Sequence, residues 1–410
     1  MAVVPLGRSF NALWAATGTA NLADGIALFS LPLIALATGS SPGGVAAVTA
    51  ALTLAWPVFG LHAGWIVDRL DRRRLLAAVN VLRAGVLAAL TTAYATDRLT
   101  LAIILAAALL LGAAETLADT GLTSTVPLVV DPHQRPRANA RIEATINLAN
   151  QMAGPPLAGL LAGLTLALAT GTSAVLYALT LAGLAVMTLR RTPTDPVRLA
   201  PVRLSGGVSF VWRQPVLRAI TLFTAGMNLV WAAALALLVV YAVEPGPLGF
   251  TPAQYGLALT AMAAGGLAAA AALERLRLRF GVTTLMIADC VGTVLLVAPV
   301  ALGTASWAVV GGLVIAGAGS SIWRILVATI RQNLTPPELL GRVYAASRVI
   351  SWGVLPAGAA LAGMGAEVWG IRPVFAIATG FAIAALLAFL VFAARTDLSA
   401  AMEPQPEAVP

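Results

Sequence analysis

Long apolar stretches, separated by short polar connections, fill this chain almost from end to end. A helix needs about 20 apolar residues to cross a hydrocarbon core of roughly 30 Å, and in lipid only helices and closed barrels satisfy their own backbone groups. The pattern predicts an all-α membrane protein whose twelve transmembrane helices lie at about 12–37, 43–66, 75–96, 99–122, 140–167, 171–190, 215–243, 252–273, 282–303, 306–330, 343–366 and 371–394.

The longest internal connection runs from Arg190 to about Arg213 and is polar and rich in proline and glycine, which is typical of a linker. It separates two groups of six spans. We therefore expect a six-helix bundle over 1–190, a cytoplasmic linker over 191–214, a second six-helix bundle over 215–395 and a disordered cytoplasmic tail over 396–410.

Weak internal similarity supports two pseudo-symmetric bundles. When Arg141 is aligned with Arg342, Pro155 falls on Pro356, so spans five and eleven resemble one another. The tripeptide that starts at Asp68 after span two likewise resembles the one that starts at Glu274 after span eight. Structural repeats of this kind are common in secondary transporters.

Composition narrows the possible functions. Apolar residues make up 59% of the chain and charged residues 10%, which leaves no sizeable water-soluble domain. One cysteine excludes an internal disulfide, and two histidines cannot form a metal cluster. The sequence has no lysine, so it can form neither a P-loop nor a Schiff base. We expect no cofactor, no metal and no enzymatic activity, and an energy supply from an ion gradient or a separate subunit.

The net charge of +8 comes from arginines whose positions indicate a membrane topology rather than a nucleic-acid-binding surface. With the N-terminus inside, nearly all arginines that flank the spans lie on the cytoplasmic side, and only Arg98 and Arg372 lie outside. This asymmetry is the positive-inside rule. It predicts a multi-pass protein of the cell (inner) membrane with both termini in the cytoplasm.

The loop between spans two and three carries the most specific motif, Gly64-Trp-Ile-Val-Asp68-Arg69-Leu-Asp71-Arg72-Arg73-Arg74. Together with twelve spans in two halves, this motif resembles the major facilitator superfamily over the whole chain. The family pattern has a second glycine where this chain has Asp71. In this respect the loop is similar to the branch that contains enterobactin exporters and macrolide efflux proteins.

The resemblance implies a gating role for this loop. Asp68 accepts hydrogen bonds from a facing arginine or from helix N-terminal amides, and so holds the two halves closed on one side until they move. The gating candidates are Gly64, Asp68, Arg69, Asp71, Arg72 and Arg73. The alternative is a basic loop that only sets the topology.

Span five contains Gly154-Pro155-Pro156-Leu157-Ala158-Gly159, which resembles a signature of antiporters that export. Glycine permits close helix packing, and proline removes an amide and bends the helix. We therefore interpret Gly154, Pro155 and Gly159 as an antiporter seam. The alternative is an ordinary proline kink.

Acids inside the spans are the candidates for ion coupling. A charge at the bilayer centre costs about 2.5–3.5 kcal/mol on insertion scales, so such residues face a cavity or a partner. Asp24 lies midway along span one and has no obvious arginine near it, and Glu115 and Asp119 lie four residues apart in span four. We predict proton coupling at these three acids; Asp289 in span nine ranks lower.

Further polar residues in the spans are candidates to line a substrate cavity. Several lie at helical spacing along span five, and Arg324 and Arg348 offer counterions from the second half. The full set is Asn21, Glu143, Asn147, Asn150, Gln151, Asn228, Trp231, Arg324 and Arg348. The alternative is that these groups only join helices by hydrogen bonds or salt bridges.

The sequence thus predicts a secondary active transporter that exports amphipathic, drug-like small molecules by proton antiport with alternating access. A siderophore or secreted-metabolite exporter and a lipid transporter stay open, as do a channel and a non-transporting scaffold. The expected partners are a small-molecule substrate, protons and the lipid bilayer, without nucleic acid, and we expect a monomer.

Overall fold

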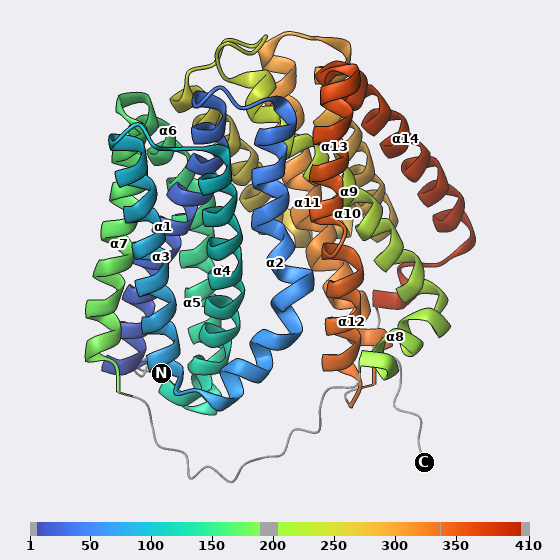
Figure 1. Cartoon of the computed structure of the whole chain (residues 1–410). Coiled ribbons are helices and arrows are strands. Elements are labelled where there is room, and N and C mark those ends of the chain that lie inside the picture. Colours follow the sequence, from blue (N-terminus) through green and yellow to red (C-terminus); the bar gives the residue numbers. More distant parts are fainter. Residues whose placement is uncertain (1–5, 189–203, 337, 403–410) are drawn as a thin grey trace. The chain divides into compact units, whose positions relative to one another are not determined.

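The computed structural model describes residues 6–188, 204–336 and 338–402, and in these residues the chain is helical apart from short connections. They contain no β-strand, only an isolated bridge between Val243 and Phe250. The all-α prediction is confirmed. The chain divides into two compact units, Met1–Arg198 with Val239–Thr260 and Leu199–Leu238 with Ala261–Pro410 (Figure 1).

The helices that pack together in the first unit are mostly not neighbours in sequence. In it α1 lies against α7, α2 against α4, and α3 against both α4 and α7. Its helices are α1 (Arg8–Ala37), α2 (Pro42–Arg69), α3 (Arg72–Ala95), α4 (Leu101–Val129), α5 (Arg135–Ile146), α6 (Gly154–Leu164) and α7 (Leu166–Val186). The 3-10 turn η1 (Pro132–Gln134) precedes α5, and the π-helix η2 (Asn147–Ala153) joins α5 to α6.

Side-chain caps explain where several of these helices begin. Ser41, Asp71, Thr100 and Thr165 each stand just before a helix and accept a hydrogen bond from the backbone N–H three residues later. Such a cap satisfies one of the amides that have no partner within the helix and contributes about 1 kcal/mol. The short loops therefore fix the starts of α2, α3, α4 and α7.

The second unit holds an apolar core between its long helices. Buried members of this core include Met286, Trp323 and Phe389. The helices are α8 (Leu204–Arg213), α9 (Pro215–Ala242), α10 (Pro252–Leu302), α11 (Ser306–Leu334), α12 (Leu340–Trp352), α13 (Leu355–Trp369) and α14 (Ile371–Arg395), and the 3-10 turn η3 (Ala400–Met402) follows. The last residues of α9 and the first of α10 belong to the first unit.

Ten helical segments in the described residues are long and apolar enough to cross a membrane, against the twelve spans expected. The segment α10 covers two expected spans, 252–273 and 282–303, and the non-helical Gly281 with φ of 77° separates them. The expected span 140–167 is broken into α5, η2 and α6. A kink and a π-helical segment, both local backbone features, thus account for the difference.

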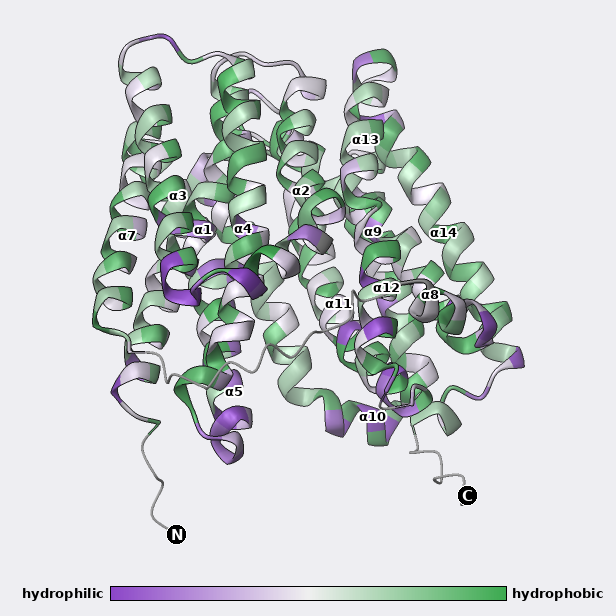
Figure 2. Ribbon diagram, turned by 60° about the horizontal axis from the view of Figure 1, so that its bottom comes forward, coloured by the Kyte–Doolittle hydropathy of each residue, from purple (hydrophilic) through white to green (hydrophobic). Residues whose placement is uncertain are grey.

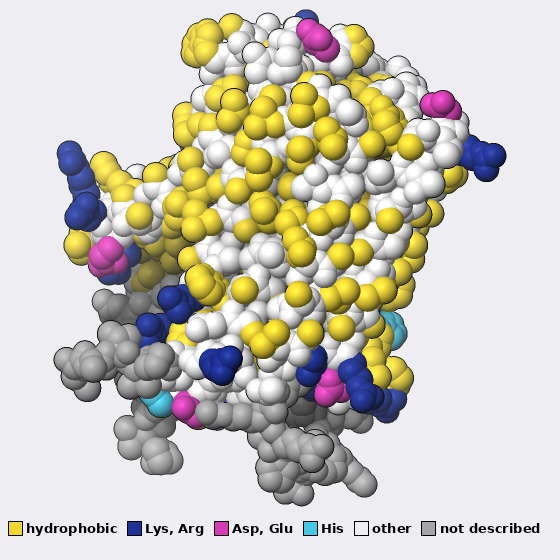
Figure 3. Space-filling view, turned by 90° about the vertical axis from the view of Figure 1, so that its left-hand side faces the viewer, with side chains coloured by type: hydrophobic (Ala, Val, Ile, Leu, Met, Phe, Trp, Pro, Cys, Tyr) yellow, Lys and Arg dark blue, Asp and Glu magenta, His cyan; other side chains and the backbone are white. Residues whose placement is uncertain are grey.

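The distribution of side chains fits helices that face lipid. In Figure 2 the helices are hydrophobic over most of their length, and hydrophilic residues gather around α5 and at one end of α10. On the face shown in Figure 3, hydrophobic side chains extend over most of the surface and arginines concentrate toward its lower edge. Exposed large side chains such as Val175, Leu179 and Val186 on α7 therefore need a hydrocarbon environment.

Two segments expected to be irregular contain helix. Of the expected linker 191–214, residues 191–203 lie outside the described part, and Leu204–Arg213 forms α8, whose Val211 is buried in the second unit's core. Of the expected tail 396–410, residues 403–410 lie outside the described part, and Ala400–Met402 forms η3. The Asn333 side chain on α11 donates to the carbonyl of Met402 at 2.8 Å and so holds η3 against α11.

Candidate functional site

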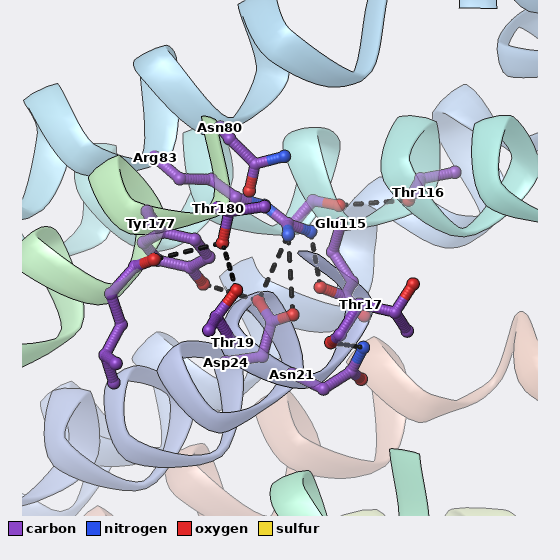
Figure 4. A network of polar contacts seen from close by, with 12 residues as sticks. Thr17, Thr19, Asn21, Asp24, Asn80, Arg83, Glu115, Thr116, Tyr177 and Thr180 are labelled. Atoms are coloured by element: carbon purple, nitrogen blue, oxygen red, sulfur yellow. Dashed lines mark hydrogen bonds and ion pairs between the residues drawn. The ribbon is translucent and has the colours of Figure 1, made fainter. Parts of the chain in front are cut away.

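A buried carboxylate on α1 is the centre of the candidate site. Asp24 is 4% exposed, and its Oδ1 accepts a hydrogen bond of 2.5 Å from the Tyr177 hydroxyl on α7. Its Oδ2 lies 3.4 Å from Nη1 of Arg83 on α3. Three helices of the first unit thus converge on one acid (Figure 4).

Arg83 joins this acid to a second one. Its Nη2 donates to Oε2 of Glu115 on α4 at 2.6 Å, and its guanidinium lies 5.3 Å from the centre of the Tyr177 ring. The Arg83 side chain is 2% exposed, and its Nε has no hydrogen-bond partner in the described residues. The planar fork of arginine suits this use, because its two terminal nitrogens serve two carboxylates. We call Asp24, Arg83, Glu115 and Tyr177 the acid–arginine cluster.

The cluster corrects one prediction and adds two residues. We expected Asp24 to have no arginine nearby, and this was wrong, because Arg83 lies 59 positions away in sequence and meets it across the bundle. Sequence analysis missed both Arg83 and Tyr177. A signal for Arg83 was present: it is an arginine in the middle of the apolar span 75–96, where an unpaired charge is costly.

A cavity of about 160 Å³ opens beside the cluster. Three predicted coupling acids and three predicted cavity residues share its wall with groups that were not predicted, among them Asn80 and Thr180. The predicted residues that line it are Asn21, Asp24, Glu115, Asp119, Asn150 and Gln151. The structure therefore brings six candidates from three regions of the sequence to one hollow in the first unit.

The π-helix η2 supplies the Asn150 and Gln151 part of this wall. π-helical segments are rare and occur often at functional sites. Two other members of the predicted polar stripe do not reach the cavity: Glu143 is exposed, and the Asn147 amide donates to the Glu143 carbonyl at 2.8 Å. Only part of the predicted stripe therefore lines this cavity.

The cavity candidates from the second half lie in the second unit, where each has a local contact. Asn228 donates to the Ser351 carbonyl at 2.6 Å, and Trp231 Nε1 lies 3.4 Å from the Thr293 hydroxyl. Arg324 and Arg348 are exposed; Arg324 lies 3.5 Å from Ser321, and Arg348 lies over the Trp352 ring at 5.0 Å. Each of these four side chains therefore has at least one contact within its own unit.

The seam residues pack tightly within the first unit. A Cβ added to Gly154 would lie 2.5 Å from Cα of Gly25 on α1, so only glycine allows this approach of α6. The segment 239–260 packs against the same seam. Gly159 faces the backbone of Pro252 in this segment, and Gly256 of this segment faces the backbone of Pro155. Since Gly25 follows Asp24, the seam directly supports the helix that carries the central acid.

The loop motif forms local contacts. Asp68 pairs with Arg72 at 3.3 Å, Arg69 lies over the Trp65 ring at 3.8 Å, and Arg73 donates to the Ala185 carbonyl of α7 at 2.5 Å. In the second unit Glu274 pairs in the same way with Arg277 at 2.7 Å. The two related segments therefore each contain an acid paired with an arginine about one turn later.

Asp71, the residue that replaces the family's second glycine, has a structural role. Its carboxylate accepts from the Arg74 N–H at 2.9 Å and caps α3. A carboxylate at a helix N-terminus also interacts favourably with the helix dipole. For Gly64, an added Cβ would meet no atom within 4 Å, so packing does not require glycine there.

These features belong to a known class of membrane carriers. The model of the Major Facilitator Superfamily matches residues 13–355, and the chain belongs to this family of transporters. It is 26% identical over 363 residues to the uncharacterized MFS-type transporter y4rN of Sinorhizobium fredii, covering 87% of each chain. It is also 26% identical over 394 residues to the multidrug efflux pump Tap of Mycobacterium tuberculosis, covering 89% of this chain and 88% of that one.

Solved structures show the same fold at low sequence identity. The nucleoside transporter NupG is 13% identical with a TM-score of 0.73, and the match covers 93% of this chain and 98% of that chain. A peptide transporter POT is 14% identical with a TM-score of 0.72, covering 98% and 100%. Membership of the Major Facilitator Superfamily makes the chain a multi-pass membrane transporter of a small molecule.

Proposed function

We propose that this protein is a proton-driven antiporter that exports amphipathic, drug-like molecules by alternating access. The observation that carries the proposal is the acid–arginine cluster beside the cavity of the first unit. The similarity to a multidrug efflux pump supports the choice of substrate class.

The charge balance of the cluster favours proton binding. One guanidinium, that of Arg83, contacts two carboxylates, those of Asp24 and Glu115. If both acids were ionised, one negative charge would stay uncompensated in a buried site, which is costly. A proton on one of the two acids removes this charge. Asp119 lines the same cavity and provides a third acid there.

The cavity wall suits an amphipathic substrate. Apolar side chains such as Leu13, Leu76 and Leu122 line it together with the amides of Asn150 and Gln151. Ligand sites of this kind gain affinity from apolar contact and orientation from a few polar groups. The proposed substrate and proton sites therefore share one cavity, so that binding of one can disfavour binding of the other.

Efflux assays test this function. In a bacterial strain without its own drug pumps, expression should lower the accumulation of some members of a panel of amphipathic drugs and siderophores. An uncoupler that collapses the proton gradient should abolish the effect, and empty vector is the control. Saturation with rising substrate separates a carrier from a channel. Efflux that persists without the proton gradient would contradict proton antiport.

Topology is a separate part of the proposal, with both termini in the cytoplasm of the cell membrane. The sequence has one cysteine, the buried Cys290, so replacing it with serine gives a cysteine-free background. Single cysteines at the exposed positions Ser41 and Pro247 should react with a membrane-impermeant maleimide from outside. Those at Asp71 and Glu338 should react only after permeabilisation, and the opposite result would reverse the topology.

A further inference from the structure

A second acid lies buried in the second unit, outside the acid–arginine cluster. Asp289 on α10 is 2% exposed, and its Oδ1 has no hydrogen-bond partner in the described part of the chain. It lies in the stretch of α10 that follows the Gly281 kink, within the expected span 282–303. A buried polar oxygen of this kind is rare and needs an explanation.

The surroundings of Asp289 are apolar and closely packed. Leu285 and Met286, one turn earlier on α10, and the adjacent Cys290 are at most 5% exposed. A Cβ added to Gly319 on α11 would lie 2.8 Å from Oδ1 of Asp289, so the backbone of α11 lies directly against the carboxyl group. One turn later, Thr293 faces Trp231 of α9. The carboxyl is therefore enclosed between helices of the core.

No described cation pairs with this acid. The charged and titratable groups on the neighbouring helices are Arg324 and Arg331 on α11 and Arg218 and Tyr241 on α9, and Cys290 lies with Asp289 in the stretch of α10 after Gly281. Arg324 lies near Ser321, Arg331 lies over the Tyr344 ring, and Arg218 lies near the Trp212 carbonyl. Among the described ion pairs, none includes Asp289.

We propose that Asp289 is a second proton-binding site, which holds its proton in the arrangement seen here. An ionised carboxylate without a counterion would carry the full cost of burial, and a group in such a site is neutral instead. The first unit differs, because Arg83 contacts both of its acids there and compensates one negative charge. The two units therefore contain two acid sites of different chemistry.

Infrared spectroscopy of the purified protein tests the site directly. At neutral pH the wild type should show a protonated carboxylic C=O band that is missing in Asp289→Asn, and the band should disappear reversibly at alkaline pH. Glu274→Gln, which changes an exposed acid of the same helix, is the matched control and should keep the band. If Asp289→Asn does not fold, Asp289→Glu should shift the band instead.

Two infrared results would overturn the proposal. One is a spectrum of Asp289→Asn that is identical to wild type in the carboxylic region, which would mean that Asp289 is ionised. The other is a band that persists at every pH at which the protein stays folded, which would make the carboxyl permanently neutral and purely structural.

The consequence for transport rests on the proposed proton coupling. In proteoliposomes, Asp289→Asn should move one proton fewer per substrate than wild type, and Glu274→Gln should leave the ratio unchanged. An unchanged ratio in Asp289→Asn would remove this acid from coupling. If the wild type moved no protons at all, the proposed antiport would fail while the infrared result on Asp289 would stand.

Discussion

Replacing Arg83 with alanine is expected to give the largest loss of stability of any single change in the first unit. The substitution leaves the buried Asp24 and the partly buried Glu115 without their shared cation, and breaking a buried ion pair by removing one partner costs about 3–5 kcal/mol. Thermal unfolding of the detergent-purified protein should show a strongly lowered midpoint, and proton-driven efflux should fall to the level of empty vector.

Two further variants separate charge from geometry at this position. Arg83→Lys keeps the positive charge but has one nitrogen where arginine uses two, so it should recover only part of the stability. The triple change Arg83→Met, Asp24→Asn and Glu115→Gln removes all charges together and should recover most of the stability without proton-driven transport. An Arg83→Ala protein as stable as wild type would show that the cluster is not held by this ion pair.

Most of the fold was accessible from sequence because the membrane imposes a simple rule. Each span must be apolar and long enough to cross lipid, so the runs of hydrophobic residues predicted the helices and the all-α class. The exception is the fifth span, where the π-helical segment 147–153 interrupts the regular helix, and hydropathy does not detect this interruption.

The site was only half predictable for a related reason. Asp24 and Glu115 stand out because acids are rare in apolar spans, whereas their partners depend on how helices rotate and pack. Arg83 is 59 positions from Asp24 and Tyr177 is 153 positions away. Spacing along one helix cannot predict such contacts.

The polar stripe of span five shows the same limit on a smaller scale. Its prediction assumed 3.6 residues per turn throughout, and a π-helical turn changes this angular spacing. As a result Asn150 and Gln151 line the cavity while Glu143 does not.

Asp24→Asn is expected to separate proton coupling from folding. The amide has nearly the shape of the protonated acid, its oxygen can still accept from the Tyr177 hydroxyl, and Arg83 keeps Glu115 as a counterion. The variant should therefore fold with a melting point near that of wild type. It should be unable to release a proton at this position, so a pH gradient should no longer drive substrate uphill.

Proteoliposomes measure both properties on the same protein. With an imposed pH gradient, Asp24→Asn should accumulate no more substrate than protein-free vesicles, whereas exchange of labelled for unlabelled substrate without a gradient should stay within several-fold of wild type. Glu274→Gln, at an exposed acid outside the cluster, should match wild type in both assays. If Asp24→Asn built as steep a substrate gradient as wild type, the coupling proton would have to bind elsewhere, with Glu115, Asp119 and Asp289 as the remaining buried or cavity-lining acids.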